Sequence, residues 1–284
     1  MFSKPANIFA FLLLFAFAVM PLLAAITYAL LYSLGVVGAL NTGFTFAHWQ
    51  KLFTENEVIF SFLYSAAIAG VSLIIAVSIS LWVALKHHNS FRKGALSYLI
   101  YMPLAFPGIV AAFFFFQLLS KSGIVSRVLY QLHITSSISG FPDLINDRYG
   151  LGMIATHCFL SIPFFILLFV NLIKTERITE YLSLSATLGA GNRPSALRIA
   201  VPMLLRKGMA NIILYFIFMF GAYEIPILLG RSNPETVSVM AVRKLQKFNL
   251  LHIPQGYAIA ILYTVIVFIL ILFMLKRRKL AYDI

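Results

Sequence analysis

The sequence predicts an all-α protein that crosses a membrane six times. Hydrophobic residues make up 61% of its 284 residues and charged residues only 11%, a composition that soluble domains of this size do not have. Six segments are long enough to cross the hydrocarbon core of a bilayer, which takes about 20 mainly apolar residues. The single cysteine, Cys158, excludes a disulfide framework and a cysteine metal site.

The six predicted spans form one transmembrane domain that covers residues 1–284. They comprise residues 8–36, 58–85, 95–119, 150–173, 209–230 and 257–275. The last span is the clearest, because only Tyr263 and Thr264 carry polar side-chain atoms between Ala258 and Leu275. The apolar run of the first is too long for a signal peptide, so we expect a retained helix.

Basic residues predict the orientation of the spans. With the N-terminus in the cytoplasm, 14 of the 22 Lys and Arg residues fall on the inner side beside three acidic residues, and eight fall on the outer side beside five. The positive-inside rule therefore places both termini in the cytoplasm. The inner set comprises Lys4, Lys86, Arg92, Lys93, Lys174, Arg177, Arg193, Arg198, Arg206, Lys207, Lys276, Arg277, Arg278 and Lys279, with the acids Glu176, Glu180 and Asp283.

The outer loops are modest in length. They comprise residues 37–57, 120–149 and 231–256, and we expect a short amphipathic helix around residues 124–132. No loop is long enough to form an enzyme domain. The net charge of +13 comes from basic residues that flank apolar spans, so it records topology and predicts no nucleic-acid partner.

One inner loop, residues 174–207, contains a polar stretch with two glycines and two prolines, "SLSATLGAGNRPSALRIAVP". Residues 178–188 are expected to form a short helix, and the glycines at 189 and 191 a turn. Pro194 suits the first turn of a second helix, and Pro202 is expected to end that helix or bend it into span five. Such a hairpin could be a docking element with a tip of small residues, or only a surface-lying link between spans.

This hairpin resembles the cytoplasmic EAA loop of binding-protein-dependent ABC importer permeases. The family pattern is Glu-Ala-Ala, three residues, Gly, nine residues, then Ile-x-Leu-Pro. Here "SLS" at residues 183–185 occupies the triplet, Gly189 the glycine and "IAVP" at residues 199–202 the ending. The spacing is preserved, but Ser183 replaces the family's acid, and Glu180 lies three residues earlier.

Three further stretches share the resemblance. "FTFAHWQKLFTENEVIFSFLYSAAIAG" is similar to the lead into span two of these permeases, and "YMPLAFPGIVAAFFFF" to their proline-broken span three. "GAYEIPILLG" resembles the end of span five in the subgroup for polyamines, iron, thiamine and phosphonates. The substrate implied is a polyamine (as in spermidine/putrescine-type permeases) or another small solute.

The resemblance implies a type I ABC importer permease in the bacterial cytoplasmic (inner) membrane. Such a subunit forms half of the translocation pathway with a second permease, a copy or a paralogue. Two cytoplasmic ATP-binding subunits dock beneath the pair, an external solute-binding protein delivers substrate, and lipid surrounds the spans. The residues that the resemblance assigns to ATPase coupling are Glu180, Ser183, Leu184, Ser185, Gly189, Ala190, Gly191 and Pro202.

Glu224 is the only carboxylate well inside a predicted span, which makes it a candidate functional residue. Gly221 and Pro226 should loosen the helix around it. Glu224 could contact a cationic substrate or hold a gate; alternatively, it caps a broken helix end or pairs with Arg231. The candidate pathway or gate residues are Tyr101, Pro103, Pro107, Tyr223, Glu224 and Pro226.

Absent motifs limit the chemistry. The chain has no G-x-x-x-x-G-K-[ST] stretch, so we expect no ATPase site of its own and a transport subunit that is not an enzyme. No cofactor or metal site is expected. The alternative function is a self-sufficient secondary transporter or channel with Glu224 as an ion or proton site, although such folds usually show internal repeats.

Overall fold

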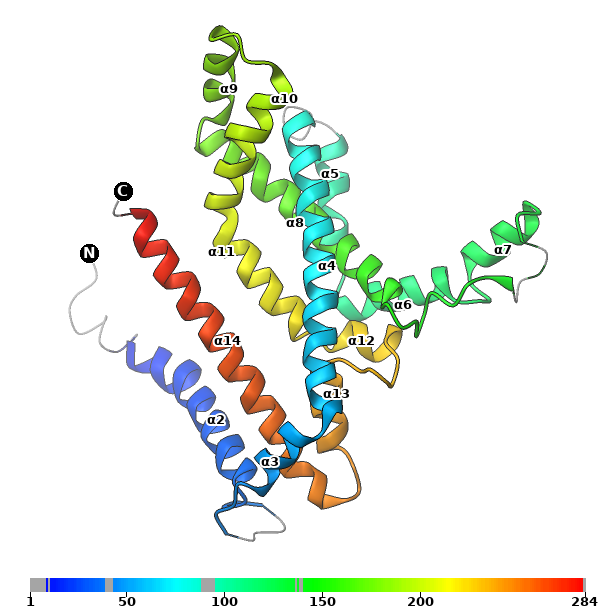
Figure 1. Cartoon of the computed structure of the whole chain (residues 1–284), viewed down its shortest axis with the longest axis vertical. Helices are drawn as coiled ribbons and strands as arrows, with labels where there is room; N and C mark the ends of the chain where they lie inside the picture. The colour runs from blue at the N-terminus through cyan, green and yellow to red at the C-terminus, as the bar shows by residue number, and fades with distance from the viewer. Residues whose placement is uncertain are drawn as a thin grey trace. The chain divides into compact units, whose positions relative to one another are not determined.

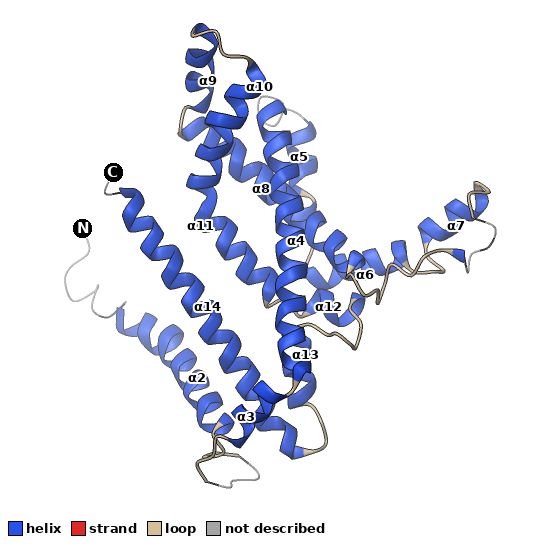
Figure 2. Ribbon diagram, viewed as in Figure 1, coloured by secondary structure: helices blue, strands red, loops and turns tan. Residues whose placement is uncertain are grey.

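A computed structural model of the chain describes residues 9, 11–38, 43–87, 95–135, 137 and 140–282, with side chains undescribed at residues 95–97 and 277–282. Lys4, Arg92, Lys93 and Asp283, which enter the charge count, lie outside the described residues, as does residue 8 at the start of the first predicted span. The regular elements of the described part are all helical (Figure 2).

Six helical segments of the described part are long and apolar enough to cross a membrane, which confirms the predicted fold class. Their bounds are Phe11–Ser33, Asn56–His87, Gly108–Gln131, Leu151–Thr175, Asn192–Phe220 and Leu250–Lys276. Each corresponds to one predicted span, although the bounds of the third and fifth and the start of the sixth differ by several residues from the prediction. The chain separates into two compact units, residues 1–61 with 237–269 and residues 62–236 with 270–284.

The first unit joins the N-terminal span to the start of the last span. Its helices are η1 (Phe15–Val19), α2 (Met20–Ser33), α3 (Ala47–Thr54), the first turn of α4 (Asn56–His87), α13 (Val237–Leu245), η5 (Leu250–His252) and most of α14 (Ile253–Tyr282). Tyr32 of α2 packs on Tyr257 of α14 with ring centroids 4.6 Å apart, and Tyr28 meets the edge of the same ring. These tyrosines hold α2 beside α14 (Figure 1).

The second unit contains the four middle spans. After α4 come α5 (Ala95–Tyr101), η2 (Pro103–Ala105), α6 (Gly108–Leu119), α7 (Ile124–Gln131), α8 (Leu151–Thr175), α9 (Ile178–Thr187), α10 (Asn192–Ser195), η4 (Ala196–Ala200), α11 (Val201–Phe220) and α12 (Glu224–Leu229). Within this unit, α9 and α10 lie at one end of α11 and α12 lies at the other (Figure 1). The amphipathic helix expected around residues 124–132 is confirmed as α7.

A buried cluster at the α12 end of this unit joins four elements. It contains Ile68 of α4, Ala112 of α6, Met153 of α8, and Ile225 and Leu229 of α12, together with Ile145 of the preceding loop. Ala112 is fully buried, so α6 packs closely against its neighbours at this small side chain. The short helix α12 is therefore fixed by core packing although it has only six residues.

Spans three and five are both interrupted. In span three, α5 ends at Tyr101, a 3₁₀ turn occupies Pro103–Ala105, and α6 begins at Gly108, so the span is broken at its prolines as the sequence resemblance implied. In span five, α11 ends at Phe220 and α12 begins at Glu224, so the break lies at residues 221–223. Pro226 lies inside α12 and does not cause this break.

Pro202 was expected to end a helix or to bend the chain into span five. It does not end a helix, because it lies within the fifth spanning helix. The helix runs without interruption from Asn192 to Phe220, so residues 192–207, which were predicted as part of the inner loop, begin the fifth spanning helix. A π-helical turn, η4, precedes the proline, and the Val201 N–H donates to the Ala196 carbonyl five residues back. The wider turn gives room to the proline ring, which would otherwise clash with a carbonyl one turn earlier.

Candidate functional site

The hairpin predicted for coupling is a compact pair of helices closed by two serines. The hydroxyl groups of Ser185 in α9 and Ser195 in α10 lie 2.8 Å apart, and both side chains are buried. Ser185 also lies 2.8 Å from the Leu182 carbonyl, and Ser195 lies 2.9 Å from the Gly191 carbonyl. Each hydroxyl has one proton, so one serine donates to the other while the second donates to its carbonyl. The two arms of the hairpin are thereby held together.

The tip of the hairpin depends on Gly189. Its φ of +83° lies in the left-handed region, in the turn that was predicted here. The Gly189 N–H donates to the Ala186 carbonyl and the Ala190 N–H to the Ser185 carbonyl, both at 3.0 Å. This pair of bonds is a Schellman motif, which ends α9 and satisfies its last carbonyls. A Cβ at Gly189 would meet no atom within 4 Å, so the tip has open space above it.

One face of α9 presents an apolar stripe to the outside. Tyr181, Leu184 and Leu188 follow one another at spacings of three and four residues, and all three are exposed, Leu188 to 82%. Residues at these spacings share a helix face. Ile178 and Ser185, by contrast, are buried against the rest of the unit. We refer to Tyr181, Leu184 and Leu188 as the α9 stripe.

Ser183 stands where the EAA loop pattern has its acid, and its side chain bonds a backbone carbonyl of its own helix. The Ser183 hydroxyl donates to the Glu180 carbonyl at 2.8 Å. The carboxylate of Glu180 is well exposed and lies 3.9 Å from the Arg177 guanidinium, at the limit of an ion pair. Glu180 is therefore the acid that α9 presents at its surface.

An ion pair ties the base of the hairpin to the fifth spanning helix. Lys207 Nζ in α11 lies 3.0 Å from the Glu176 carboxylate, at the end of α8. The exposed fractions are 53% and 29%, so solvent only partly screens this pair. It joins the chain just before α9 to the helix that follows the hairpin.

The candidate pathway residues lie at the two span breaks. Tyr101 ends α5 with an exposed ring, Pro103 opens the 3₁₀ turn, and Pro107 precedes the first residue of α6. Tyr223 precedes α12, and Pro226 is buried within it. The first three residues therefore lie at the break in span three, Tyr223 lies in the break in span five, and Pro226 lies in the helix after that break. Their role in a pathway stays a prediction.

Glu224 joins the two breaks. Its Oε2 atom accepts a hydrogen bond from the Ile109 backbone N–H at 2.9 Å, across 115 residues of sequence. Neither Pro107 nor the first turn of α6 supplies a capping or acidic side chain, so Glu224 caps this helix from a distance. A carboxylate is favourable there, because the first N–H groups of a helix lack partners and carry partial positive charge. A Cβ at Gly108 would lie 2.6 Å from the same oxygen.

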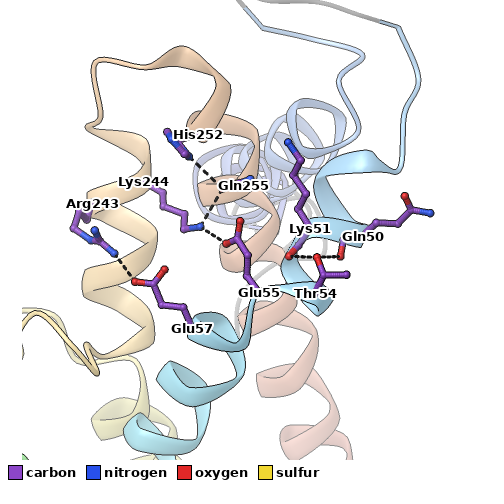
Figure 3. A network of polar contacts seen from close by, with 9 residues as sticks. All are labelled: Gln50, Lys51, Thr54, Glu55, Glu57, Arg243, Lys244, His252 and Gln255. Carbon is purple, nitrogen blue, oxygen red and sulfur yellow. Dashed lines mark hydrogen bonds and ion pairs between the residues drawn. The ribbon is translucent and has the colours of Figure 1, made fainter.

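A polar network in the first unit was missed by sequence reasoning (Figure 3). Lys244 of α13 is only 4% exposed and lies 2.8 Å from the Glu55 carboxylate and 3.0 Å from Gln255 Oε1 of α14. Arg243 pairs with Glu57 at 3.2 Å. These contacts join the α3–α4 junction to α13 and to the start of α14. No sequence signal pointed to them, because the partners of Lys244 include a residue 189 positions away.

No group of three His, Cys, Asp or Glu side chains in the described part of the chain could hold a metal ion.

Comparison with known proteins identifies a family pattern over most of the chain. Residues 76–278 match the family described as "Binding-protein-dependent transport system inner membrane component". The molybdenum transport system permease protein ModB of Azotobacter vinelandii is 23% identical over 189 residues, which are 66% of this chain and 78% of ModB. The thiamine transport system permease protein ThiP of Brucella suis biovar 1 (strain 1330) is 25% identical over 187 residues, 65% of this chain and 32% of ThiP.

Two solved structures share the fold. A chain of a bacterial alginate ABC transporter, in complex with an alginate pentasaccharide-bound periplasmic protein, superposes with a TM-score of 0.71 at 16% identity and covers 94% of this chain and 91% of that one. A chain of a bacterial ABC transporter involved in import of the acidic polysaccharide alginate gives 0.68 at 18% identity, with 97% and 93% covered.

Proposed function

Because the chain belongs to the family of binding-protein-dependent transport system inner membrane components, we propose that it forms half of the translocation pathway of an ATP-driven importer. A second permease subunit, a copy or a paralogue, supplies the other half, and two cytoplasmic ATPase subunits dock on the pair. An external solute-binding protein delivers the solute. The ATP is hydrolysed by the partner subunits, and this chain converts their movement into opening of the pathway.

The α9 stripe is the observation that carries this proposal. Tyr181, Leu184 and Leu188 expose apolar side chains on a hairpin that is internally fixed by Ser185 and Ser195. A preformed, exposed apolar helix face is suited to a hydrophobic groove on a partner, because little conformational entropy is lost on docking. The proposed partner surface is such a groove on the ATPase subunit, with Glu180 at its edge.

Copurification tests this docking. The chain is co-expressed with candidate ABC importer ATPase subunits from its own organism, and Leu184→Glu and Leu188→Glu are compared with the wild type. Each is expected to lower the recovered ATPase about tenfold or more, because a charge replaces a buried interface side chain. Thr179→Glu is the matched control, since Thr179 is exposed on the other side of the same helix. A wild-type chain that binds no ATPase, or that imports solute alone in proteoliposomes, contradicts the proposed function.

The proposed topology places the hairpin and both termini in the cytoplasm. Its support is the distribution of basic residues around the spans. In a Cys158→Ala background, single cysteines at Ser183 and at Asn249 are treated in intact cells with a thiol reagent that does not cross membranes. Labelling at 249 but not at 183 is the expected result, and the reverse pattern contradicts the topology.

The proposed substrate is a small organic cation, a polyamine or thiamine. The resemblance of "GAYEIPILLG" to the polyamine, iron, thiamine and phosphonate subgroup supports it, as does the similarity to ThiP. Because the chain is also similar to ModB, molybdate is the competing candidate substrate in the test. A rise in the melting temperature of the partner binding protein with spermidine, putrescine or thiamine, but not molybdate, is expected, and the opposite selectivity contradicts this assignment.

A further inference from the structure

The carboxylate of Glu224 lies where the interruptions of spans three and five meet. The break in span five ends at Tyr223, and Glu224 is the first residue of α12. The break in span three ends at Pro107, and the Ile109 N–H, in the first turn of α6, donates to Glu224 Oε2 at 2.9 Å. This side chain therefore links the first residue after the break in span five to the first turn after the break in span three.

The surrounding chain is arranged for this bond. Gly108 leaves the space that the carboxylate occupies, since a Cβ there would lie 2.6 Å from Oε2. Ile225 and Leu229 of α12 and Ala112 of α6 belong to one buried cluster, so the helices on the far side of both breaks already form one packed body. Glu224 lies at the edge of that body, next to the end of α11.

The helix that reaches this point begins in the coupling hairpin. From Asn192 to Phe220 the backbone is helical without interruption, so a displacement of the hairpin moves the whole helix up to the break. After the break, Glu224 is the first residue of α12, and its carboxylate is bonded to α6. A helix is stiff along its axis, and the first two residues of the break stay bonded to it, because the Gly221 and Ala222 N–H groups donate to the Ile217 and Met219 carbonyls at 3.1 and 3.2 Å.

We propose that Glu224 is a positioning residue that passes the movement of the fifth spanning helix to the second half of span three through its hydrogen bond to Ile109. The inference rests on the proposed importer function. The bond makes α12 and α6 respond together when the hairpin moves. The role needs a hydrogen-bond acceptor at position 224. It does not need a negative charge that binds solute or carries a proton.

The test compares Glu224→Ala with Glu224→Gln in the full importer complex reconstituted in proteoliposomes. Glu224→Ala is expected to lower the solute imported per ATP hydrolysed about fivefold, a loss typical of one coupling residue, while the ATPase rate is retained. Glu224→Gln is expected to keep most of the wild-type ratio, because its amide oxygen can accept the Ile109 N–H. Asp143→Ala, which removes a carboxylate from an exposed pair with Lys121 in the same unit, is the matched control.

Hydrogen exchange at the Ile109 amide supplies a second readout. Exchange in Glu224→Ala is expected to be about tenfold faster than in the wild type, and exchange in Glu224→Gln close to the wild type. Gly108→Ala should resemble Glu224→Ala in both measurements, because the new Cβ displaces the carboxylate. Combining the two substitutions should add little to either one alone.

Three results would overturn the proposal. The first is a Glu224→Gln complex that is as impaired as Glu224→Ala, which would assign the role to the charge. The second is a normal import ratio in Glu224→Ala, and the third is unchanged exchange at Ile109. Failure of the importer function itself looks different, because then the wild-type chain neither binds an ATPase nor shows import that depends on ATP.

Discussion

The hydroxyl groups of Ser185 and Ser195 lie 2.8 Å apart inside the hairpin, ten residues from one another in sequence. Ser185 stands at the last position of the family's Glu-Ala-Ala triplet, where alanine has no hydrogen-bonding group. In this chain the triplet therefore supplies a polar contact between the two arms of the loop. This chain thus differs from the family pattern in two ways. It lacks the acid of the triplet, and a serine pair holds its hairpin closed.

Ser185→Ala and Ser195→Ala test this contact. Each is expected to destabilise the hairpin by about 1 kcal/mol, the usual net contribution of one hydrogen bond, because a buried hydroxyl loses a partner. The double variant is expected to cost less than the sum of the two, since no unpaired hydroxyl remains. Hydrogen exchange across residues 178–200 measures the effect, and Ser183→Ala, which removes an exposed hydroxyl, is the control. Strict additivity would show that the two serines act independently.

Gly189→Ala is expected to weaken ATPase docking by distorting the hairpin tip. An alanine in the left-handed region costs about 1–2 kcal/mol, and Gly189 has a φ of +83°. Gly191→Ala is the matched control, because the φ of Gly191 is −70° and a Cβ there would come no closer than 3.6 Å to Pro194. Copurification of the ATPase reports both effects. Equal losses in the two variants would exclude backbone conformation as the cause.

His48 is expected to make the first unit sensitive to acid. Its partial burial, with a smaller effect of the nearby Lys51 ammonium, lowers the pKa of His48 below its ordinary value of 6.5. As the pH falls below 6.5, the unfolded chain binds a proton that the folded chain does not, so the free energy of unfolding decreases. His48→Gln should remove this part of the pH dependence. Melting temperatures of both forms in detergent, measured at neutral and mildly acidic pH, check it; equal losses would contradict the assignment.

The six spans were predictable because lipid imposes one requirement, about 20 apolar residues in a row, that composition alone reveals. The break in span three was predictable for a similar reason, since Pro103 and Pro107 cannot continue a helix. Pro202 misled because a π-helical turn at residues 196–200 accommodates its ring. Whether a proline ends a helix depends on the turn before it, which the sequence does not reveal.

The candidate site was predictable in part. Gly189 and Pro194 have backbone requirements that are visible in the sequence, and the structure places them in the turn and in the first turn of α10. Glu224 was also singled out, but its partner is the backbone N–H of Ile109, and a backbone amide carries no sequence signal. The contact between Ser185 and Ser195 was missed because serines in a polar loop are unremarkable until the fold brings them together.

Lys244 and Arg243 allow a comparison of a buried and an exposed ion pair within one network. Lys244 is 4% exposed and bonds both Glu55 and Gln255, whereas Arg243 is 40% exposed and pairs with Glu57. Lys244→Met is expected to lower the free energy of unfolding by about 2 kcal/mol, less than for a fully buried pair because Glu55 stays partly solvated. Arg243→Met should cost only about 0.5 kcal/mol, as exposed pairs do.

Melting temperatures of the two methionine variants in detergent check this difference. Adding Glu55→Gln to Lys244→Met is expected to recover part of the loss, because the carboxylate left without its ammonium is then neutral. Adding Glu57→Gln to Arg243→Met should change little. Equal losses for Lys244→Met and Arg243→Met would mean that burial does not strengthen the Lys244 pair, and that the junction of α3, α13 and α14 is held by apolar packing instead.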